Sequence, residues 1–130
     1  MRESIVAAHR SLDSLFETTR RSLEEGLGAP ATDAFCRLRE ALEAHFELED
    51  RLYYPPIAAL RPEARISVQQ FAAAHEVFRK KFGEIGDLLE RSRFDEAGRV
   101  FGQFAEVFAI HEAAEEKLLA ELDRDVSAAR

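Results

Sequence analysis

Apolar residues recur every three or four positions along the chain, and no segment shows the two-residue alternation that is typical of a β-strand. This spacing predicts four amphipathic helices, at about residues 2–25, 33–54, 62–91 and from 96 onward. Four such helices joined by short connections are expected to pack as an up-down-up-down antiparallel four-helix bundle. The predicted fold class is therefore all-α, with a single domain that spans residues 1–130.

Each predicted helix carries one apolar face, which would turn inward and form the core. Cys36 is expected to be a core residue without a chemical role. The inward positions expected besides histidines and glutamates are Ile5, Ala8, Leu12, Phe16, Thr19 and Leu23; Phe35, Leu38, Leu42, Leu52 and Pro56; Phe71, Ala74, Phe78, Phe82, Ile85 and Leu89; and Val100, Phe104, Val107, Phe108, Leu118 and Leu122.

Glycine and proline mark the predicted helix ends. Residues 26–30 hold two glycines and a proline, and the threonine or aspartate at 32–33 would cap the second helix. The double proline at 55–56 is expected to end that helix, because proline lacks an amide donor and clashes with the preceding turn. The third helix would begin at Pro62 or at a capping box that starts with Ser67.

Composition narrows the class of protein. The chain has 46% apolar and 33% charged residues, as is normal for a globular domain. Its net charge of −7 argues against nucleic acid as a partner, and no apolar run approaches the ~20 residues of a membrane span. The N-terminus is amphipathic from its first residues, so no signal peptide is expected. The single cysteine suits a reducing compartment, and the expected location is the cytoplasm.

A histidine followed four residues later by a glutamate occurs twice. His45 and Glu49 form the first copy, and His111 and Glu115 form the second. On a helix this spacing puts both side chains on one face, where both can reach the same metal ion. The offset of 66 residues pairs His45 with His111, Glu49 with Glu115, Asp50 with Glu116, Arg51 with Lys117 and Leu52 with Leu118.

The same offset places His9 on His75, so that all four histidines belong to one duplicated frame. The chain is therefore interpreted as two helix hairpins, each with one histidine followed by a His-x-x-x-Glu motif. When about 1.5 Å per residue is counted from the turn between the third and fourth helices, His75 and His111 lie at the same height. The four histidines are expected to converge in one layer of the bundle.

This layer predicts a metal site in the core. A lone inward histidine is usually a core residue, but four histidines and two glutamates in one layer are not explained that way, because buried carboxylates lose their charge or destabilise the fold unless paired. Mixed nitrogen and oxygen ligands suit several transition metals. The Glu-x-x-His pattern of ferritin-like di-iron sites is absent, as are a glycine loop for nucleotides and a recognisable catalytic triad. The candidate ligands are His9, His45, Glu49, His75, His111 and Glu115.

Several neighbours leave alternatives open. Asp13 is either an additional ligand or a surface acid, and Asp50 and Glu116 are alternative bridging carboxylates. Glu116 could instead orient a ligand histidine. Tyr53 stands four residues after the glutamate of the first motif and would either donate a hydrogen bond to the bridge or pack in the core, whereas Tyr54 is expected on another face.

The whole chain resembles the hemerythrin-like family, also called the HHE cation-binding domain, through its four histidines, two His-x-x-x-Glu motifs and the Leu-Tyr-Tyr-Pro that follows the first. The resemblance implies two iron ions joined by an oxo or hydroxo bridge and two carboxylates. Zinc, manganese or cobalt could also bind such donors. By this resemblance His9 and His45 would ligate one iron, His75 and His111 the other, and Glu49 and Glu115 would bridge them.

One departure from the family bears on function. Oxygen-carrying members have a second histidine four residues after the first on the third helix, where this chain has Arg79, expected to be a surface residue. Their last bridging carboxylate falls five residues after the histidine, at Glu116 rather than Glu115. The expected function is therefore binding of a small ligand such as O2, peroxide or NO at an open di-iron centre. The alternatives are an iron sensor or donor, of the iron-homeostasis or Fe–S repair type, and an enzyme that processes peroxide or NO.

Overall fold

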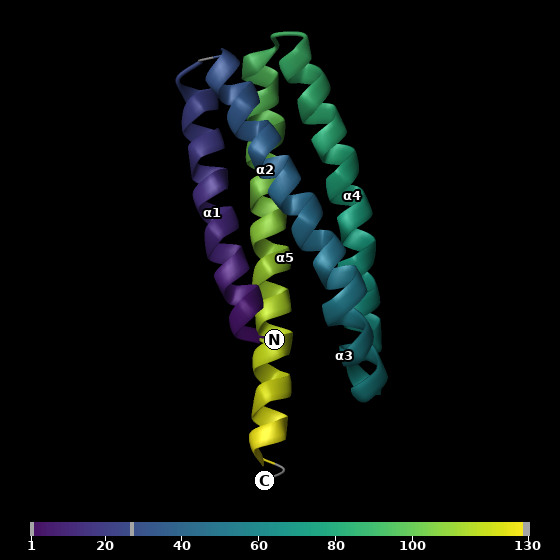
Figure 1. Cartoon of the computed structure of the whole chain (residues 1–130). Helices are drawn as coiled ribbons and strands as arrows, with labels where there is room; N and C mark the ends of the chain where they lie inside the picture. Colours follow the sequence, from purple (N-terminus) through teal and green to yellow (C-terminus); the bar gives the residue numbers. More distant parts are fainter. Residues whose placement is uncertain (1, 27, 129–130) are drawn as a thin grey trace.

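The computed structural model describes residues 2–26 and 28–128, and its described part contains helices and turns without a β-strand (Figure 1). The elements in chain order are α1 (Arg2–Glu24), α2 (Gly28–Leu48), a π-helical turn (Glu49–Tyr53), α3 (Tyr54–Leu60), a 3-10 turn (Pro62–Ala64), α4 (Arg65–Glu90) and α5 (Phe94–Ala128).

Four long helices lie side by side, with α1 and α4 both packed against α5, and α2 packed against α1 and α4 (Figure 1). The tight connections from α1 to α2 and from α4 to α5 lie at one end of the bundle, whereas α3 and the start of α1 lie toward the other. None of the described helices is both long enough and apolar enough to cross a membrane.

The duplicated frame extends into the core. At the 66-residue offset, buried Leu23 corresponds to Leu89 and buried Phe35 to Phe101. These side chains belong to one hydrophobic cluster that fills the bundle from the tight connections down to the histidines. Since both hairpins bury matching positions, the two halves of the sequence contribute alike to one core. Its fully buried large side chains include Phe35, Phe46, Phe82, Phe108, Leu38, Leu42 and Ile85.

Both tight connections reverse through a residue with positive φ. Gly26 has φ 69° and follows α1, while Leu27 lies outside the described residues. Ser92 has φ 57° and ends α4 in a Schellman arrangement, in which its amide donates to the Leu89 carbonyl at 3.0 Å and the Arg93 amide donates to the Leu88 carbonyl at 2.9 Å. These bonds satisfy carbonyls that the end of the helix would otherwise leave without partners.

The prediction that the second helix ends at the double proline is wrong. The helix passes through a π-helical turn, in which the Tyr54 amide donates to the Glu49 carbonyl, and continues as α3 to Leu60. Proline is tolerated at 55–56 because both residues fall in the first turn of α3. The wider π turn also rotates the residues within and beyond it, so Leu52 is 60% exposed and Pro56 is exposed, against the inward positions predicted for them.

Two predicted helix starts also differ. α2 already begins at Gly28, and the Thr32 hydroxyl donates to the Gly28 carbonyl at 3.0 Å within the helix instead of capping it. Pro62 opens a 3-10 turn that leads directly into α4 at Arg65, so the capping box predicted at Ser67 falls inside the helix. The connection between the hairpins is therefore mostly helical.

Besides Leu52 and Pro56, two further residues expected in the core are exposed. Cys36 follows buried Phe35, and one further residue turns a helical side chain by about 100°, which carries Cys36 to the surface. Val107 is 53% exposed because Phe104 and Phe108 already occupy the inward stripe of α5. The apolar face of α5 is thus narrower than its sequence predicts.

Candidate metal centre

The four histidines meet inside the bundle, one from each long helix. The ring centroids of His9 and His45 lie 5.2 Å apart, and those of His75 and His111 lie 5.4 Å apart. The first pair joins α1 and α2, and the second joins α4 and α5. Each hairpin therefore supplies one pair of imidazoles.

Glu49 lies between the two pairs. It is 0% exposed, and its Oε1 lies 3.3 Å from Nε2 of His45 and 3.2 Å from Nε2 of His75. Glu115 spans the pairs in the complementary way, with Oε1 3.2 Å from Nε2 of His9 and Oε2 3.5 Å from Nε2 of His111. Each carboxylate thus contacts one histidine of each pair, which is the arrangement required of a ligand shared by two ions.

The donor atoms fall into two overlapping groups among the described residues. Within each group the donor atoms lie within 4.8 Å of one another, and Glu49 belongs to both groups. All six candidate ligands identified in the sequence are brought together here. The groups are His9, His45, Glu49 and Glu115, and Glu49, His75 and His111.

The donor residues fit a pair of metal ions, because several of their buried nitrogen and oxygen atoms have no hydrogen-bond partner. Both carboxylate oxygens of Glu49, Oε1 of Glu115 and Nε2 of His111 are buried without a hydrogen bond. The neighbouring imidazoles are near these oxygens but do not have hydrogen-bond geometry toward them. A buried carboxylate without a partner is strongly unfavourable. Divalent or trivalent cations between these nitrogen and oxygen atoms would satisfy all of them at once.

The electrostatics favour neutral imidazoles at His45 and His75. Burial, reinforced by neighbouring histidines, lowers the pKa of His45 to about 4 and that of His75 to about 3, so both rings are neutral near pH 7 and their lone pairs are free to bind metal. Burial, together with the nearby carboxyl of Glu115, raises the pKa of Glu49 to about 11. Without a cation, Glu49 therefore carries a proton.

Tyr54 contacts this centre, contrary to the prediction that it lies on another face. Its hydroxyl donates to Oε2 of Glu115 at 2.6 Å and lies 3.5 Å from Nε2 of His75. Burial, followed by the charge of Glu115, raises the pKa of Tyr54, so the hydroxyl stays protonated. The nearby imidazoles of His111 and His9, together with the hydrogen bond from Tyr54, outweigh burial and lower the pKa of Glu115.

The π-helical turn explains why Tyr54 and not Tyr53 is the neighbour of the centre. In an α-helix a residue five positions after Glu49 points about 140° away from it, but a π-helical turn holds more residues, so the fifth position returns to the same face. Tyr53 is half-buried and packs in the smaller apolar cluster beside α3. The adjacent double proline was the available sequence signal, because it demands an irregularity in the hydrogen-bond ladder.

A second layer of carboxylates lies behind two histidines. Oδ1 of Asp50 is 3.0 Å from Nδ1 of His75, and Oε2 of Glu116 is 3.3 Å from Nδ1 of His9. Both acids, considered above as alternative bridges, therefore lie behind the histidines and outside the donor groups. Asp13 is exposed and also lies outside them.

Glu112 was not among the residues predicted for the site. This side chain is only 7% exposed, and its Oε2 lies 3.7 Å from Nδ1 of His9 without a hydrogen bond. Burial, countered in part by His9 and reinforced by Asp13, raises its pKa to about 8. Its position directly after His111 gave no signal, because on a helix that position points away from the histidine.

Arg79 is more than the surface residue that was predicted. Its Nε donates to Glu43 at 3.0 Å, a second nitrogen bonds to Glu76, and its guanidinium lies 5.7 Å from the ring centre of Phe46. Nη2 lies 4.0 Å from Oδ2 of Asp50. Arg79 thus reaches from α4 to α2 at the edge of the centre. Its guanidinium lies beside the Asp50 carboxylate, on the side away from His75.

Aromatic rings enclose the histidines. Phe46 stacks on His75 at 4.1 Å between ring centroids, and Phe78 and Phe71 meet His111 edge-on at 5.2 and 5.4 Å. These rings exclude water from the second histidine pair, which strengthens charge interactions inside the centre.

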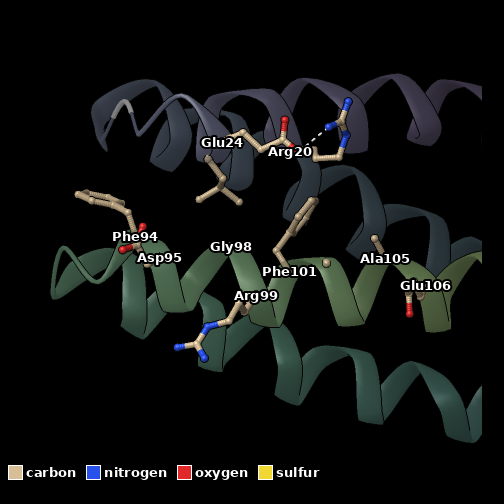
Figure 2. Close-up of a pocket in the computed structure, with 11 residues that line it drawn as sticks. Arg20, Glu24, Phe94, Asp95, Gly98, Arg99, Phe101, Ala105 and Glu106 are labelled. Carbon is tan, nitrogen blue, oxygen red and sulfur yellow. Dashed lines mark hydrogen bonds and ion pairs between the residues drawn. The ribbon is translucent and has the colours of Figure 1, made fainter.

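A surface pocket of about 560 Å³ lies elsewhere, between α1 and α5 near the tight connections (Figure 2). Phe94, Phe101 and Leu23 line it together with Gly98 and Gly102, whose missing side chains leave the space open. None of the donor residues borders it, because Leu23 is about 20 Å along α1 from His9.

Comparison with known families agrees with this geometry. The family model described as the hemerythrin HHE cation binding domain matches residues 1–122, a range that contains every donor residue and Tyr54. No curated protein and no solved structure matches the chain.

Proposed function

Because this chain belongs to the hemerythrin HHE cation-binding domain family, we propose that it holds two iron ions and binds O2 or a related small oxidant, such as peroxide or NO, beside them. The observation that carries the proposal is the position of Glu49. One buried oxygen of this residue lies within 3.3 Å of imidazole nitrogens from both histidine pairs. Proteins rarely bury a carboxylate in this way unless cations compensate its charge.

The proposed ligand assignment follows the two hairpins. His9 and His45 would hold one ion, and His75 and His111 the other. The carboxylates of Glu49 and Glu115 would be shared, since each lies beside one histidine of each pair. We propose with it that the four long helices run alternately up and down in the bundle.

The donor count favours binding of a small ligand. Two histidines and two shared carboxylates would provide four donor atoms for each ion, fewer than the six that octahedral iron accepts. Iron, when bound, would supply the open coordination positions and the electrons for an oxidant. The chain supplies the surroundings: the Tyr54 hydroxyl holds one oxygen of Glu115 by its hydrogen bond, and the phenylalanine rings keep water away from the second pair.

Metal analysis combined with spectroscopy tests this function. Protein purified without oxygen should contain two iron ions per chain, and exposure to air should produce charge-transfer bands in the near-ultraviolet and visible range. His111→Ala should lose these bands, whereas Glu47→Gln, a change at an exposed pair with Arg51, should keep them. A colourless protein with two tightly bound zinc ions, and no spectral response to O2, peroxide or NO, would refute the proposal.

One observation favours a second function, that of an iron sensor or donor. The carboxyl of Glu49 is buried without a hydrogen-bond partner, which would destabilise the metal-free fold and couple iron binding to folding. A sensor should have iron affinity in the cellular range and a metal-free form that is partly unfolded by circular dichroism. A metal-free protein as stable as the iron form would exclude this role. Steady-state consumption of peroxide or NO, absent in His111→Ala, would instead identify an enzyme.

A further inference from the structure

The carboxylates behind the histidines follow the duplication of the chain. Asp50 directly follows Glu49, and Glu116 directly follows Glu115, at equivalent positions of the repeat. Asp50 lies on the first hairpin but contacts His75 of the second. Glu116 lies on the second hairpin but contacts the repeat-equivalent histidine of the first.

Each pair of adjacent acids therefore holds both nitrogens of one imidazole from the opposite hairpin. Glu49 lies 3.2 Å from Nε2 of His75, and Asp50 lies 3.0 Å from its Nδ1. At the other end, Glu115 lies 3.2 Å from Nε2 of His9, and Glu116 contacts the Nδ1 of that ring at 3.3 Å. An imidazole that donates Nδ1–H to a carboxylate directs the lone pair of Nε2 in the opposite direction, which here is into the centre.

We infer that Asp50 and Glu116 are positioning residues, each of which orients the first histidine of the opposite hairpin so that its Nε2 faces one of the two ions. This inference rests on the proposed two-ion centre. It assigns a separate carboxylate to each ion, Asp50 to the ion of the second hairpin and Glu116 to the ion of the first. The two acids also tie the hairpins together at the level of the metal.

The two histidines differ in how many carboxylates lie near their Nδ1 atoms. Asp50 is the carboxylate contact of His75 Nδ1, and the opposite side of Asp50 faces Arg79. Nδ1 of His9 has two acids nearby, Glu116 at 3.3 Å and the buried Glu112 at 3.7 Å. At the repeat position of Glu112 the first hairpin has Phe46, which stacks on His75 and offers no replacement acceptor.

Co2+ titration of the full chain tests the inference, with a competing chelator and the d–d absorption as readout. Asp50→Asn should weaken one of the two ions about 10- to 100-fold and leave the other at its wild-type affinity. Glu116→Gln alone should weaken the other ion less than about 10-fold because Glu112 remains, and the double change Glu112→Gln with Glu116→Gln should reach about 10- to 100-fold. His75→Gln and His9→Gln assign the two binding steps, and Glu47→Gln is the matched control on an exposed part of α2.

A second readout needs no metal. Long-range 1H–15N spectra of the metal-free protein should show His75 and His9 protonated at Nδ1, with the His75 signals moving in Asp50→Asn and the His9 signals moving in the double variant. Wild-type Co2+ affinities in Asp50→Asn, equal weakening of both ions, or an unprotonated Nδ1 on His75 would overturn the inference. If the wild type binds fewer than two Co2+ ions while these tautomer shifts occur, the orienting role stands and the two-ion function fails.

Discussion

Glu49→Gln is expected to stabilise the metal-free protein and to remove its response to metal. Glutamine has nearly the shape of glutamate, so packing at this fully buried position is retained. The substitution removes only the ionisable carboxyl, whose oxygens have no hydrogen-bond partner. The same change would leave the proposed ions without a shared charged ligand. Stability without metal and stability with metal should therefore shift in opposite directions.

The size of the effect follows from the pKa of Glu49, which burial and the neighbouring Glu115 raise from 4.5 to about 11. Above pH 4.5 the unfolded chain releases this proton and the folded chain keeps it, so folding becomes less favourable as pH rises. At about 1.4 kcal/mol per pH unit, the penalty is roughly 3 kcal/mol at pH 7 and below about 1 kcal/mol at pH 5. Glu49→Gln should recover most of that penalty.

Urea unfolding followed by circular dichroism, in EDTA at pH 5 and pH 7, measures the difference. Glu47→Gln is the control, since Glu47 is exposed on the same helix and its change should stay within about 0.5 kcal/mol. Metal at about 1,000 times its Kd should add about 4 kcal/mol to the wild type and much less to Glu49→Gln. A Glu49→Gln protein that is less stable than the wild type in EDTA at pH 7 would refute the reasoning, because the carboxylate would then have a partner in the metal-free fold.

Three further changes probe the surroundings of the centre. Tyr54→Phe removes the 2.6 Å hydrogen bond to Glu115 and should lower stability by about 1 kcal/mol and weaken metal binding, whereas unchanged affinity in chelator competition would contradict this role. Burial raises the pKa of Glu112 from 4.5 to about 8, so its carboxyl lowers the stability of the metal-free protein increasingly between these pH values. In urea unfolding, the gain in free energy from Glu112→Gln should therefore grow with pH from 4.5 to about 8 and then level off. A gain that does not depend on pH would contradict this prediction. Phe46→Ala should destabilise the fold by about 3–5 kcal/mol in urea unfolding, because this fully buried ring stacks on His75, and a loss below about 1 kcal/mol would show that the site collapses around the gap.

Much of the centre could be predicted from local spacing. A histidine and a glutamate four residues apart must share a helix face, and the 66-residue repeat places both such motifs in matching hairpins. The structure brings these residues together with His9 and His75, which the same offset identified. The helical class was predictable for the same reason, since the three-to-four spacing of apolar residues leaves no other regular element.

The errors just after Glu49 arose because one helix departs from regular α geometry there. The positions of Leu52, Tyr53 and Tyr54 were predicted by continuing the α-helical period beyond Glu49, but the π-helical turn changes that period. As a result Leu52 faces solvent and Tyr54 reaches Glu115. The double proline indicated that the helical hydrogen bonds are interrupted, but it did not indicate whether the helix would end or continue through a π-helical turn.

The sequence by itself determined the helical class, the duplicated frame and the six side chains that meet in the core, because each depends on the period of a helix and on residues close along the chain. Tertiary structure alone decided that Asp50 supports His75, that Glu112 is buried beside His9, and that Arg79 covers the edge of the centre. These contacts join different helices, so their geometry is set by how the helices pack. No spacing within one helix encodes the distance between side chains on two.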